Sequence, residues 1–495
     1  MTQDDFLLPQ TKAWLEQPKK LLIGNRWLDS VDGATIDVTD PATLETLCAV
    51  QLASSGDVDL AVSAAQRALN GVWGETTPAE RGRLLWRLAD LIDEHADILR
   101  QLESLDVGKP VMETYVFDLP LTSDHFRYFA GWATKITGQS IPSSLPGEAL
   151  CYTRHEPVGV VAAIVPWNFP LAIAAWKLAP ALACGNAVIL KPSEITPLTA
   201  LYLGELMLEA GFPSGAVGIL PGLGAVTGAA LVEHAGVDKV SFTGSTRVGR
   251  EIMQKAGGNF KRVTLELGGK SPNIILPDAN ISDAIGGAMT AMFFNQGEAC
   301  VAGSRLYVPK ALKADVLEQL ATRAAGIVQG LSLDPATQMG PLVSQMQLER
   351  VLGFIERGVA AGAQLVTGGS RNTSAGAGYF VQPTVFSAAD DLELSREEIF
   401  GPVLTVLEYE DIDDLVTRAN DSVYGLGAGV WTADVKTGIR IAHRLKAGTV
   451  WVNGWGMLEA SMPWGGYKQS GIGREMGSYA LQHYTEVKSV WVNLL

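Results

Sequence analysis

The sequence predicts an α/β fold of two or more domains, each built on a parallel β-sheet. From about residue 158, short apolar runs bounded by Gly, Pro or Asn alternate with helical stretches. Fully apolar strands separated by helices are typical of parallel βαβ units, whose sheets are covered on both faces. A chain of 495 residues is also too long for one compact core. A nucleotide at the carboxyl edge of such a sheet is the default expectation.

The first third of the chain is predicted to be mostly helical. At Thr77–Glu80, a capping threonine, a proline at the first helical position and a glutamate at the third form a capping box. Leucines recur behind it at helical spacing, so we expect one amphipathic helix to run to about Leu105.

Two sets of strands and helices follow. A helix is expected at Leu198–Ala210, ending at Gly211, because glycine readily adopts the left-handed conformation that closes helices. A second helix is expected near Ser282–Phe294, and the tail Thr485–Leu495 is predicted to be a strand that pairs with another subunit. The other expected strands are Val158–Val165, Ala187–Leu190, Val217–Leu220, Lys239–Phe242, Asn273–Leu276 and Ser304–Val308.

Composition argues against several classes of function. A net charge of −15, with Lys and Arg scattered along the chain, disfavours nucleic-acid binding, which needs a basic face. Prolines interrupt the apolar stretch from Pro157 to Leu190, which disfavours a membrane span. The four cysteines and six histidines have no metal-ligand spacing, so no metal is expected. Because Met1–Leu15 also lacks a signal-peptide pattern, we expect a cytoplasmic protein.

Three side chains are candidates for chemistry on local grounds. Cys300 lies in a glycine-flanked turn before a strand, where a thiol can be accessible and reactive; the alternative is a small buried hydrophobe. Asn168 follows an apolar strand and could donate to an oxyanion, or could only satisfy its own loop. Glu266 is a carboxylate inside an apolar strand, which favours a base with a raised pKa; the alternative is an ion pair, for example with Lys270.

The best candidate for a dinucleotide site is the segment that begins at Phe242. Gly244 should form the turn after a strand, and Ser245 should open a helix whose free N–H groups can hold a pyrophosphate. The GxGxxxG run at Gly222–Gly228 is one residue too long for the usual fingerprint, so alone it is a weak signal.

In their order, the motifs of this chain resemble the aldehyde dehydrogenase superfamily, specifically its NAD-dependent hydrolytic branch. The resemblance runs from about Leu21 to the C-terminus. The stretch Phe126–Trp132 with Ile141–Leu145 is also similar to bacterial phenylacetaldehyde and aliphatic aldehyde dehydrogenases. The family motifs are PWNFP at Pro166–Pro170, KPSE at Lys191–Glu194, FTGST at Phe242–Thr246, LELGGKSP at Leu265–Pro272, FFNQGEAC at Phe293–Cys300, EEIFGPV at Glu397–Val403 and PWGGYKQSGIGRE at Pro463–Glu475.

The resemblance implies a catalytic role for five residues. Cys300 matches the nucleophile that forms a thiohemiacetal and then a thioester, and the Asn168 amide with the Cys300 backbone N–H should hold the oxyanion. Glu266 matches the base that activates the deacylating water, and Lys177 and Glu475 match its proton-relay partners.

The resemblance also implies NAD as the cofactor. Lys191 and Glu194 match contacts to the adenosine ribose, and a carboxylate there repels a 2′-phosphate, which favours NAD over NADP. Glu398 matches the nicotinamide-ribose contact, with Phe400 beside the ring, and Ser245 a pyrophosphate contact. The other expected cofactor positions are Pro166, Trp167, Gly224, Phe242, Gly244 and Leu267.

Three parts are implied by the resemblance. They are a Rossmann-like NAD-binding domain at 1–140 and 158–266, an α/β catalytic domain at 267–476, and a small β oligomerisation arm at 141–157 and 477–495. A homodimer or a homotetramer made of two dimers is the assembly usual in the family.

Positions that match the family's substrate tunnel are apolar and aromatic. This favours medium-chain aliphatic aldehydes or arylacetaldehydes, since each buried methylene contributes about 0.8 kcal/mol. An amino-aldehyde such as betaine aldehyde is the alternative, because Glu459 lies close by and tryptophans can hold an ammonium group. A CoA-acylating relative and a catalytically silent paralogue are disfavoured by the presence of Glu266, Cys300 and Asn168. The tunnel positions are Leu121, Phe169, Ile173, Trp176, Phe294, Trp455, Met457, Leu458 and Trp464.

Overall fold

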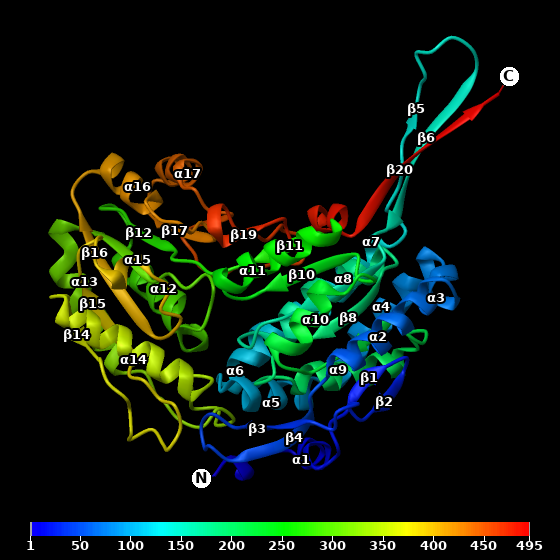
Figure 1. Cartoon of the computed structure of the whole chain (residues 1–495). Helices are drawn as coiled ribbons and strands as arrows, with labels where there is room; N and C mark the ends of the chain where they lie inside the picture. Colours follow the sequence, from blue (N-terminus) through cyan, green and yellow to red (C-terminus); the bar gives the residue numbers. More distant parts are fainter. Residues whose placement is uncertain (1, 495) are drawn as a thin grey trace.

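The computed structural model describes residues 2–494, as two α/β halves with a narrow arm projecting from one of them (Figure 1). The first half contains an eight-stranded sheet whose five central strands are parallel. In spatial order its strands are β19 (Gly471–Ile472), β11 (Arg262–Glu266), β10 (Lys239–Thr243), β7 (Val160–Ile164), β8 (Ala187–Lys191), β9 (Val217–Ile219), β1 (Leu21–Ile23) and β2 (Arg26–Leu28).

Helices pack against this first sheet, and α8, α9, α10 and α11 each follow one of its parallel strands. Helix α9 ends at Gly211 with φ of 89°, which confirms the prediction for Leu198–Ala210. The predicted strands are present within two residues at each end. The helices of this half are α1 (Pro9–Leu15), α2 (Ser55–Leu69), α3 (Val72–Glu75), α4 (Pro78–Glu94), α5 (Ala96–Val107), α6 (Val111–Glu113), α7 (Leu119–Trp132), α8 (Pro170–Ala183), α9 (Leu198–Ala210), α10 (Ala229–Glu233) and α11 (Thr246–Ala256).

The prediction of a mostly helical N-terminal third was wrong for residues 21–51. Strands β1 and β2 form a hairpin on the edge of the first sheet, and β3 (Thr35–Thr39) pairs with β4 (Thr46–Gln51). These strands are short, and β1 depends on β9, almost 200 residues later, for its other partner. The capping box at Thr77 is present, but the helix behind it ends at Glu94, because His95 leaves the helical conformation before α5 begins.

The second half contains a seven-stranded sheet that is parallel except at one edge. Only β14 runs antiparallel to its neighbour β15. In spatial order its strands are β14 (Gln364–Thr367), β15 (Thr384–Ser387), β16 (Val403–Tyr409), β13 (Arg305–Pro309), β12 (Pro272–Ile275), β17 (Gly427–Trp431) and β18 (Thr449–Val452). Its main helices are α12 (Ile281–Phe293), α13 (Lys313–Ala325), α14 (Gln345–Ala360), α16 (Ile412–Asn420) and α17 (Val435–Arg444).

The arm is a three-stranded antiparallel sheet that projects from the first half (Figure 1). Strand β20 (Thr485–Asn493) pairs along the whole of β6 (Ala149–Pro157), which in turn pairs with β5 (Ser140–Ile141). The tail is therefore a strand, as predicted, but one of its edges is taken by its own chain. Leu495 lies outside the described residues.

No helix in residues 2–494 combines the length and apolarity that crossing a bilayer requires.

Candidate active site

Cys300 lies in the loop between α12 and β13, in the second half of the molecule. The loop is strained before the cysteine, since Asn295, Gln296 and Gly297 have φ of 47°, 53° and 73° in succession. Asparagine tolerates this left-handed region better than most residues, and glycine adopts it freely. The turn leaves Cys300 half-buried at the inner end of an apolar cavity.

Amide hydrogen bonds tie this loop to Asn168, which comes from the first half. Asn168 Nδ2 donates to the carbonyl of Glu298 at 2.8 Å. Asn295 Nδ2 donates to the carbonyl of Asn168 at 2.9 Å and, at 3.3 Å, to the same Glu298 carbonyl. An amide nitrogen has two hydrogens, so Asn168 keeps one for another acceptor. The loop thus carries the thiol and is joined to the predicted oxyanion donor.

Glu113 supports the loop from behind. Its Oε2 accepts the backbone N–H of Asn295 at 2.9 Å, and burial raises the pKa of this carboxyl to about 8. The sequence analysis missed Glu113 and Asn295, because neither contact is visible until the two halves are packed together.

The surroundings of Cys300 disfavour its thiolate. Burial, with a smaller contribution from the nearby carboxylates of Glu398 and Glu266, raises its pKa to about 12. A cationic group beside the sulfur would reverse these effects and favour the thiolate.

Glu266, the last residue of β11, is buried and has no partner for either carboxylate oxygen. Burial raises its pKa well above the usual value, and the neighbouring Glu475 raises it as well. The alternative of an ion pair with Lys270 is wrong, because Lys270 Nζ is also buried without a hydrogen-bond partner. An unpaired carboxyl of this kind is suited to accept a proton.

Lys177 and Glu475 form a buried ion pair next to Glu266. Lys177 Nζ donates to Glu475 Oε1 and also to Ser241 Oγ, which lies 3.2 Å from the amine. Ser241 Oγ in turn donates to Glu475 Oε1 at 2.9 Å. The pair comes from α8 and from the segment after β19, so the fold brings together three groups that the sequence separates by up to 298 residues.

Several predicted cofactor residues lie at the carboxyl ends of the first sheet's strands. Lys191 ends β8, and its Nζ donates to Glu194 Oε2 at 3.4 Å. Ser245 caps α11 by accepting the N–H of Val248 at 3.3 Å. Next to it, Thr243 and Thr246 each have a buried hydroxyl without a partner. This helix start therefore offers polar groups to a ligand.

The other predicted cofactor residues surround the same edge. Nothing lies within 4 Å of the position a side chain at Gly224 would take, whereas at Gly244 it would meet the Phe242 ring at 2.5 Å. Leu267 packs in the same way against Gly249. Trp167, which follows Pro166, lies edge-on to Phe400 with ring centroids 5.2 Å apart.

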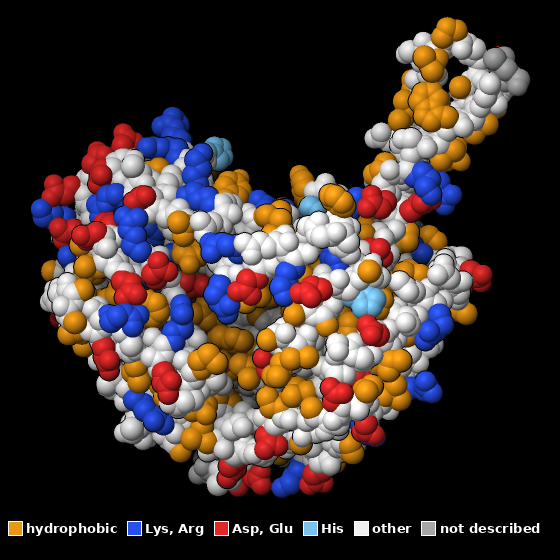
Figure 2. Space-filling view, viewed as in Figure 1, with side chains coloured by type: hydrophobic (Ala, Val, Ile, Leu, Met, Phe, Trp, Pro, Cys, Tyr) orange, Lys and Arg blue, Asp and Glu red, His pale blue; other side chains and the backbone are white. Residues whose placement is uncertain are grey.

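Glu398 faces this edge from the second half. Its Oε1 accepts the N–H of Gly269 at 2.9 Å, and burial raises its pKa to about 7. Figure 2 shows a hollow between the two halves, with hydrophobic side chains in its walls.

An apolar cavity of about 200 Å³ leads to Cys300 from the other side. Seven of the nine predicted tunnel residues line it, namely Phe169, Ile173, Trp176, Phe294, Trp455, Leu458 and Trp464. Their rings contact one another, as in the stacked pair Phe169 and Phe294 and the tilted pair Trp176 and Trp464. The sequence analysis missed Val116, Phe117, Ala172, Thr290, Trp451 and others in the lining.

The remaining two predicted tunnel residues lie further out. Leu121 and Met457 line a wider vestibule of about 460 Å³, which shares Val116, Phe117 and Leu458 with the inner cavity. Asp124 and Glu459 also line this vestibule, so it combines an apolar wall with two carboxylates.

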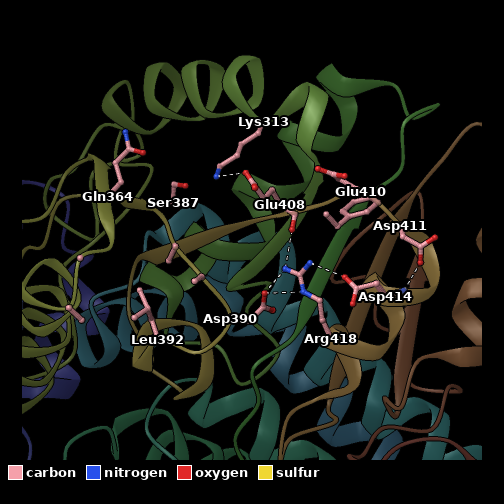
Figure 3. A pocket seen from close by; sticks show the side chains of 15 residues that line it. Lys313, Gln364, Ser387, Asp390, Leu392, Glu408, Glu410, Asp411, Asp414 and Arg418 are labelled. Carbon is pink, nitrogen blue, oxygen red and sulfur yellow. Dashed lines mark hydrogen bonds and ion pairs between the residues drawn. The ribbon is translucent and has the colours of Figure 1, made fainter.

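A larger surface hollow lies in the second half, and none of the predicted site residues lines it (Figure 3). Its charges pair with one another: Lys313 with Glu408 at 2.8 Å, and Arg418 with both Asp390 and Asp414. Because these groups already satisfy one another, the cavity at Cys300 is the better candidate site. Within residues 2–494, no three His, Cys, Asp or Glu side chains are grouped so that they could hold a metal ion.

Comparisons with known proteins agree with this geometry. Residues 27–490 match the model of the aldehyde dehydrogenase family. The chain is 55% identical to DhaS of Bacillus subtilis (strain 168), covering 98% of this chain and 97% of that protein. It is 47% identical to human retinal dehydrogenase 2, covering 99% and 94% of the two chains.

A solved structure gives the same answer. An aldehyde dehydrogenase from Bacillus cereus, determined as its NAD⁺ complex, superposes with a TM-score of 0.97 at 50% identity and covers 99% of both chains. A family match over nearly the whole length, supported by relatives of this similarity, shows that the chain belongs to the aldehyde dehydrogenase family.

Proposed function

We propose that the protein oxidises an apolar aldehyde to its carboxylate with NAD⁺ and water, through a thioester on Cys300. The observation that carries the proposal is the position of Cys300 between an apolar cavity and an unpaired, buried carboxyl at Glu266. The thiolate adds to the aldehyde carbon, and the oxyanion that forms accepts hydrogen bonds from the free Asn168 amide hydrogen and the Cys300 backbone N–H.

The residues at the edge of the first sheet fit NAD. The open space at Gly224, the unpartnered hydroxyls of Thr243 and Thr246, and the start of α11 suit a pyrophosphate. Glu194 suits a ribose with a free 2′-hydroxyl and disfavours a 2′-phosphate. When bound, NAD⁺ supplies the hydride acceptor, and Glu398 and Phe400 would contact its nicotinamide half.

Glu266 serves as the base in deacylation. Its ionised form takes a proton from the water that attacks the thioester carbon, the carbon–sulfur bond breaks, and Cys300 leaves as the thiolate. The raised pKa of Glu266 makes it a stronger base than an exposed carboxylate.

The cavity supports an apolar substrate. Among the described residues that line it, Thr290 is the only one with a side-chain hydroxyl, and apart from Cys300 the other side chains of the wall are aliphatic or aromatic. A volume of about 200 Å³ suits a medium-chain aliphatic or arylacetaldehyde tail.

An amino-aldehyde is the second candidate substrate. Asp124 and Glu459 line the vestibule, where they could attract a cationic tail, and Trp455 lines the inner cavity, where its ring could hold an ammonium group. Because these two carboxylates do not line the inner cavity, an apolar aldehyde is the preferred substrate.

We also propose a homodimer or homotetramer assembled through the arm. Val487 and Trp491 on β20, and Leu494 directly after it, are exposed apolar side chains, which association would cover. The same proposal assigns the first half to cofactor binding and the second half to catalysis.

A panel of aldehydes tests the substrate. NADH formation at 340 nm would be followed with acetaldehyde, hexanal, octanal, phenylacetaldehyde and betaine aldehyde, each with NAD⁺ and NADP⁺. From acetaldehyde to octanal, kcat/KM should rise about four-fold per methylene until the cavity is full, since each contributes about 0.8 kcal/mol. Preference for betaine aldehyde would assign specificity to Asp124 and Glu459 instead.

A further inference from the structure

A chain of buried hydrogen bonds leads from Glu475 into the first sheet. Lys239 Nζ donates to Thr264 Oγ1 at 2.9 Å, Thr264 Oγ1 donates to Ser241 Oγ at 3.2 Å, and Ser241 Oγ donates to Glu475 Oε1 at 2.9 Å. All four side chains are buried, with at most 3% of their surface exposed.

This chain of hydrogen bonds follows one face of the paired strands β10 and β11. Ser241 lies opposite Thr264 in the parallel register. Alternate residues share a face, so Lys239 lies beside Ser241 on β10, and Glu266 beside Thr264 on β11. Glu266 ends its strand at the carboxyl edge, and Lys239 begins its strand at the opposite edge. The polar groups therefore extend along the length of these two strands, from the edge of the sheet at the active site to the opposite edge.

We propose that Ser241, Thr264 and Lys239 form a proton exit, which carries the proton taken up by Glu266 in deacylation through Glu475 to the far edge of the sheet. This inference rests on the proposed function. It extends the predicted pair of Lys177 and Glu475 by three residues for which the sequence showed no signal.

The proton balance defines what the exit must carry. In deacylation, the water oxygen bonds to the thioester carbon and the Cys300 sulfur leaves as a thiolate. One water proton goes to Glu266, and the second ionises from the carboxylic acid product. Glu266 must lose its proton before the next turnover. When Glu475 is protonated and Lys239 is neutral, the two hydroxyls turn so that the three bonds run the other way, from Glu475 to Ser241, from Ser241 to Thr264 and from Thr264 to Lys239. Each hydroxyl then accepts one hydrogen as it releases another, and the proton that leaves Glu475 is matched by one that reaches the amine of Lys239.

Lys239 is suited to receive the proton. Burial lowers its pKa to about 7, so a neutral amine is available near neutral pH. The charged groups that act on it are Glu475, which favours its protonation, and Lys177 and Arg262, which oppose it. The Tyr484 ring lies 4.7 Å from Nζ.

From Lys239 the route reaches half-buried groups at the base of the arm. Arg262 lies opposite Lys239 in the register of β10 and β11, and burial together with the charge of Lys239 lowers the pKa of His483 to about 4. His483 and Arg262 are both partly exposed, so the proton can pass from here to solvent.

The test compares two substitutions at Thr264. Thr264→Val removes the hydroxyl but keeps the shape, whereas Thr264→Ser keeps the hydroxyl. With NAD⁺ and hexanal, Thr264→Val should turn over at least about ten-fold more slowly in the steady state. This loss of rate is smaller than the loss expected when the general base itself is removed. Its acyl-enzyme, seen on Cys300 by intact-mass spectrometry, should accumulate. Thr264→Ser should retain most of the wild-type rate.

A pH profile separates proton transfer from a structural role. The midpoint of the steady-state rate of Thr264→Val should move to higher pH, because Glu266, with its raised pKa, must then lose its proton without the chain. Ser241→Ala should behave in the same way, and the double variant should be no slower than either single variant. The matched control is Thr405→Val, which changes a buried threonine in a strand of the second sheet. It should change neither the steady-state rate nor the midpoint of its pH profile.

Normal turnover and no acyl-enzyme in both Thr264→Val and Ser241→Ala would overturn the proton exit. Failure of the proposed function is a different result: the wild-type protein would then form neither NADH nor an adduct on Cys300 with any aldehyde.

Discussion

The two parallel sheets both bury charged side chains, but they treat them differently. In the second sheet, Arg305 of β13 donates from Nε to the carbonyl of Lys270, from Nη1 to Tyr307 and from Nη2 to the carbonyl of Ala419. In the first sheet, neither carboxylate oxygen of Glu266 has a partner. A buried charge whose hydrogen bonds are satisfied supports the fold, whereas an unsatisfied one is available for chemistry.

The largest expected effect is the loss of the sulfur. Cys300→Ala should lower aldehyde oxidation by at least about 10⁴-fold, since no other group in the cavity can form the thioester. NAD⁺ binding, followed by isothermal titration, should be retained, because the predicted cofactor residues lie on the other side of the loop. Substantial remaining turnover would remove Cys300 from the reaction.

Glu266→Gln should lower the steady-state rate by about 10²- to 10³-fold, because the amide cannot accept the water proton. The acyl-enzyme should accumulate on Cys300. The variant should be no less stable than the wild type, since no hydrogen bond of Glu266 is lost. A clear drop in the unfolding midpoint would mean that Glu266 is structural, as Arg305 is.

Arg305→Met should lower the stability of the protein but not its activity, the reverse of what is expected for Glu266→Gln. It leaves the two buried carbonyls without the donor, and each unsatisfied buried acceptor costs about 1–3 kcal/mol, so the free energy of unfolding should fall by about 3–5 kcal/mol. Urea unfolding measures this loss. The folded enzyme should keep kcat within about two-fold of wild type, and a selective loss of kcat at normal stability would contradict the comparison.

The smallest effect concerns the pH dependence of the thiol. Because burial raises the pKa of Cys300 to about 12, its thiolate fraction should grow about ten-fold per pH unit from pH 7 to 9. The rate of carboxamidomethylation by iodoacetamide, read by peptide mass spectrometry in the absence of NAD⁺, should follow this slope. Modification of the buried Cys184, measured in the same samples, serves as the internal reference. A modification rate of Cys300 that reaches a plateau below pH 9 would indicate a thiol that is activated without cofactor.

Much of the fold could be predicted from local patterns. Helix α9 was predicted at its observed bounds, because Gly211 marks its end with a conformation that few other residues adopt. Strands β1 and β2 were missed because three residues carry no clear alternation and their pairing depends on β9. The end of α4 at His95 has no glycine or proline to mark it.

The site was predicted unevenly for a similar reason. The motifs contain Cys300, Asn168 and Glu266, so the residue types alone drew attention to them. Phe117, Thr264 and Lys239 lie in segments without a motif, and only the packing of the halves and the pairing of β10 with β11 give them a place. A buried lysine is indistinguishable from a surface lysine in a sequence.

The position of β19 has a consequence for biosynthesis. This two-residue strand pairs with β11, directly beside Glu266, and Glu475 follows it within four residues. A ribosome releases these residues after both sheets are otherwise complete, so a nascent chain can fold most of its first half while the neighbourhood of Glu266 stays open. The newly made enzyme should therefore gain activity as a late event, when residues 471–475 close over a domain that has already formed.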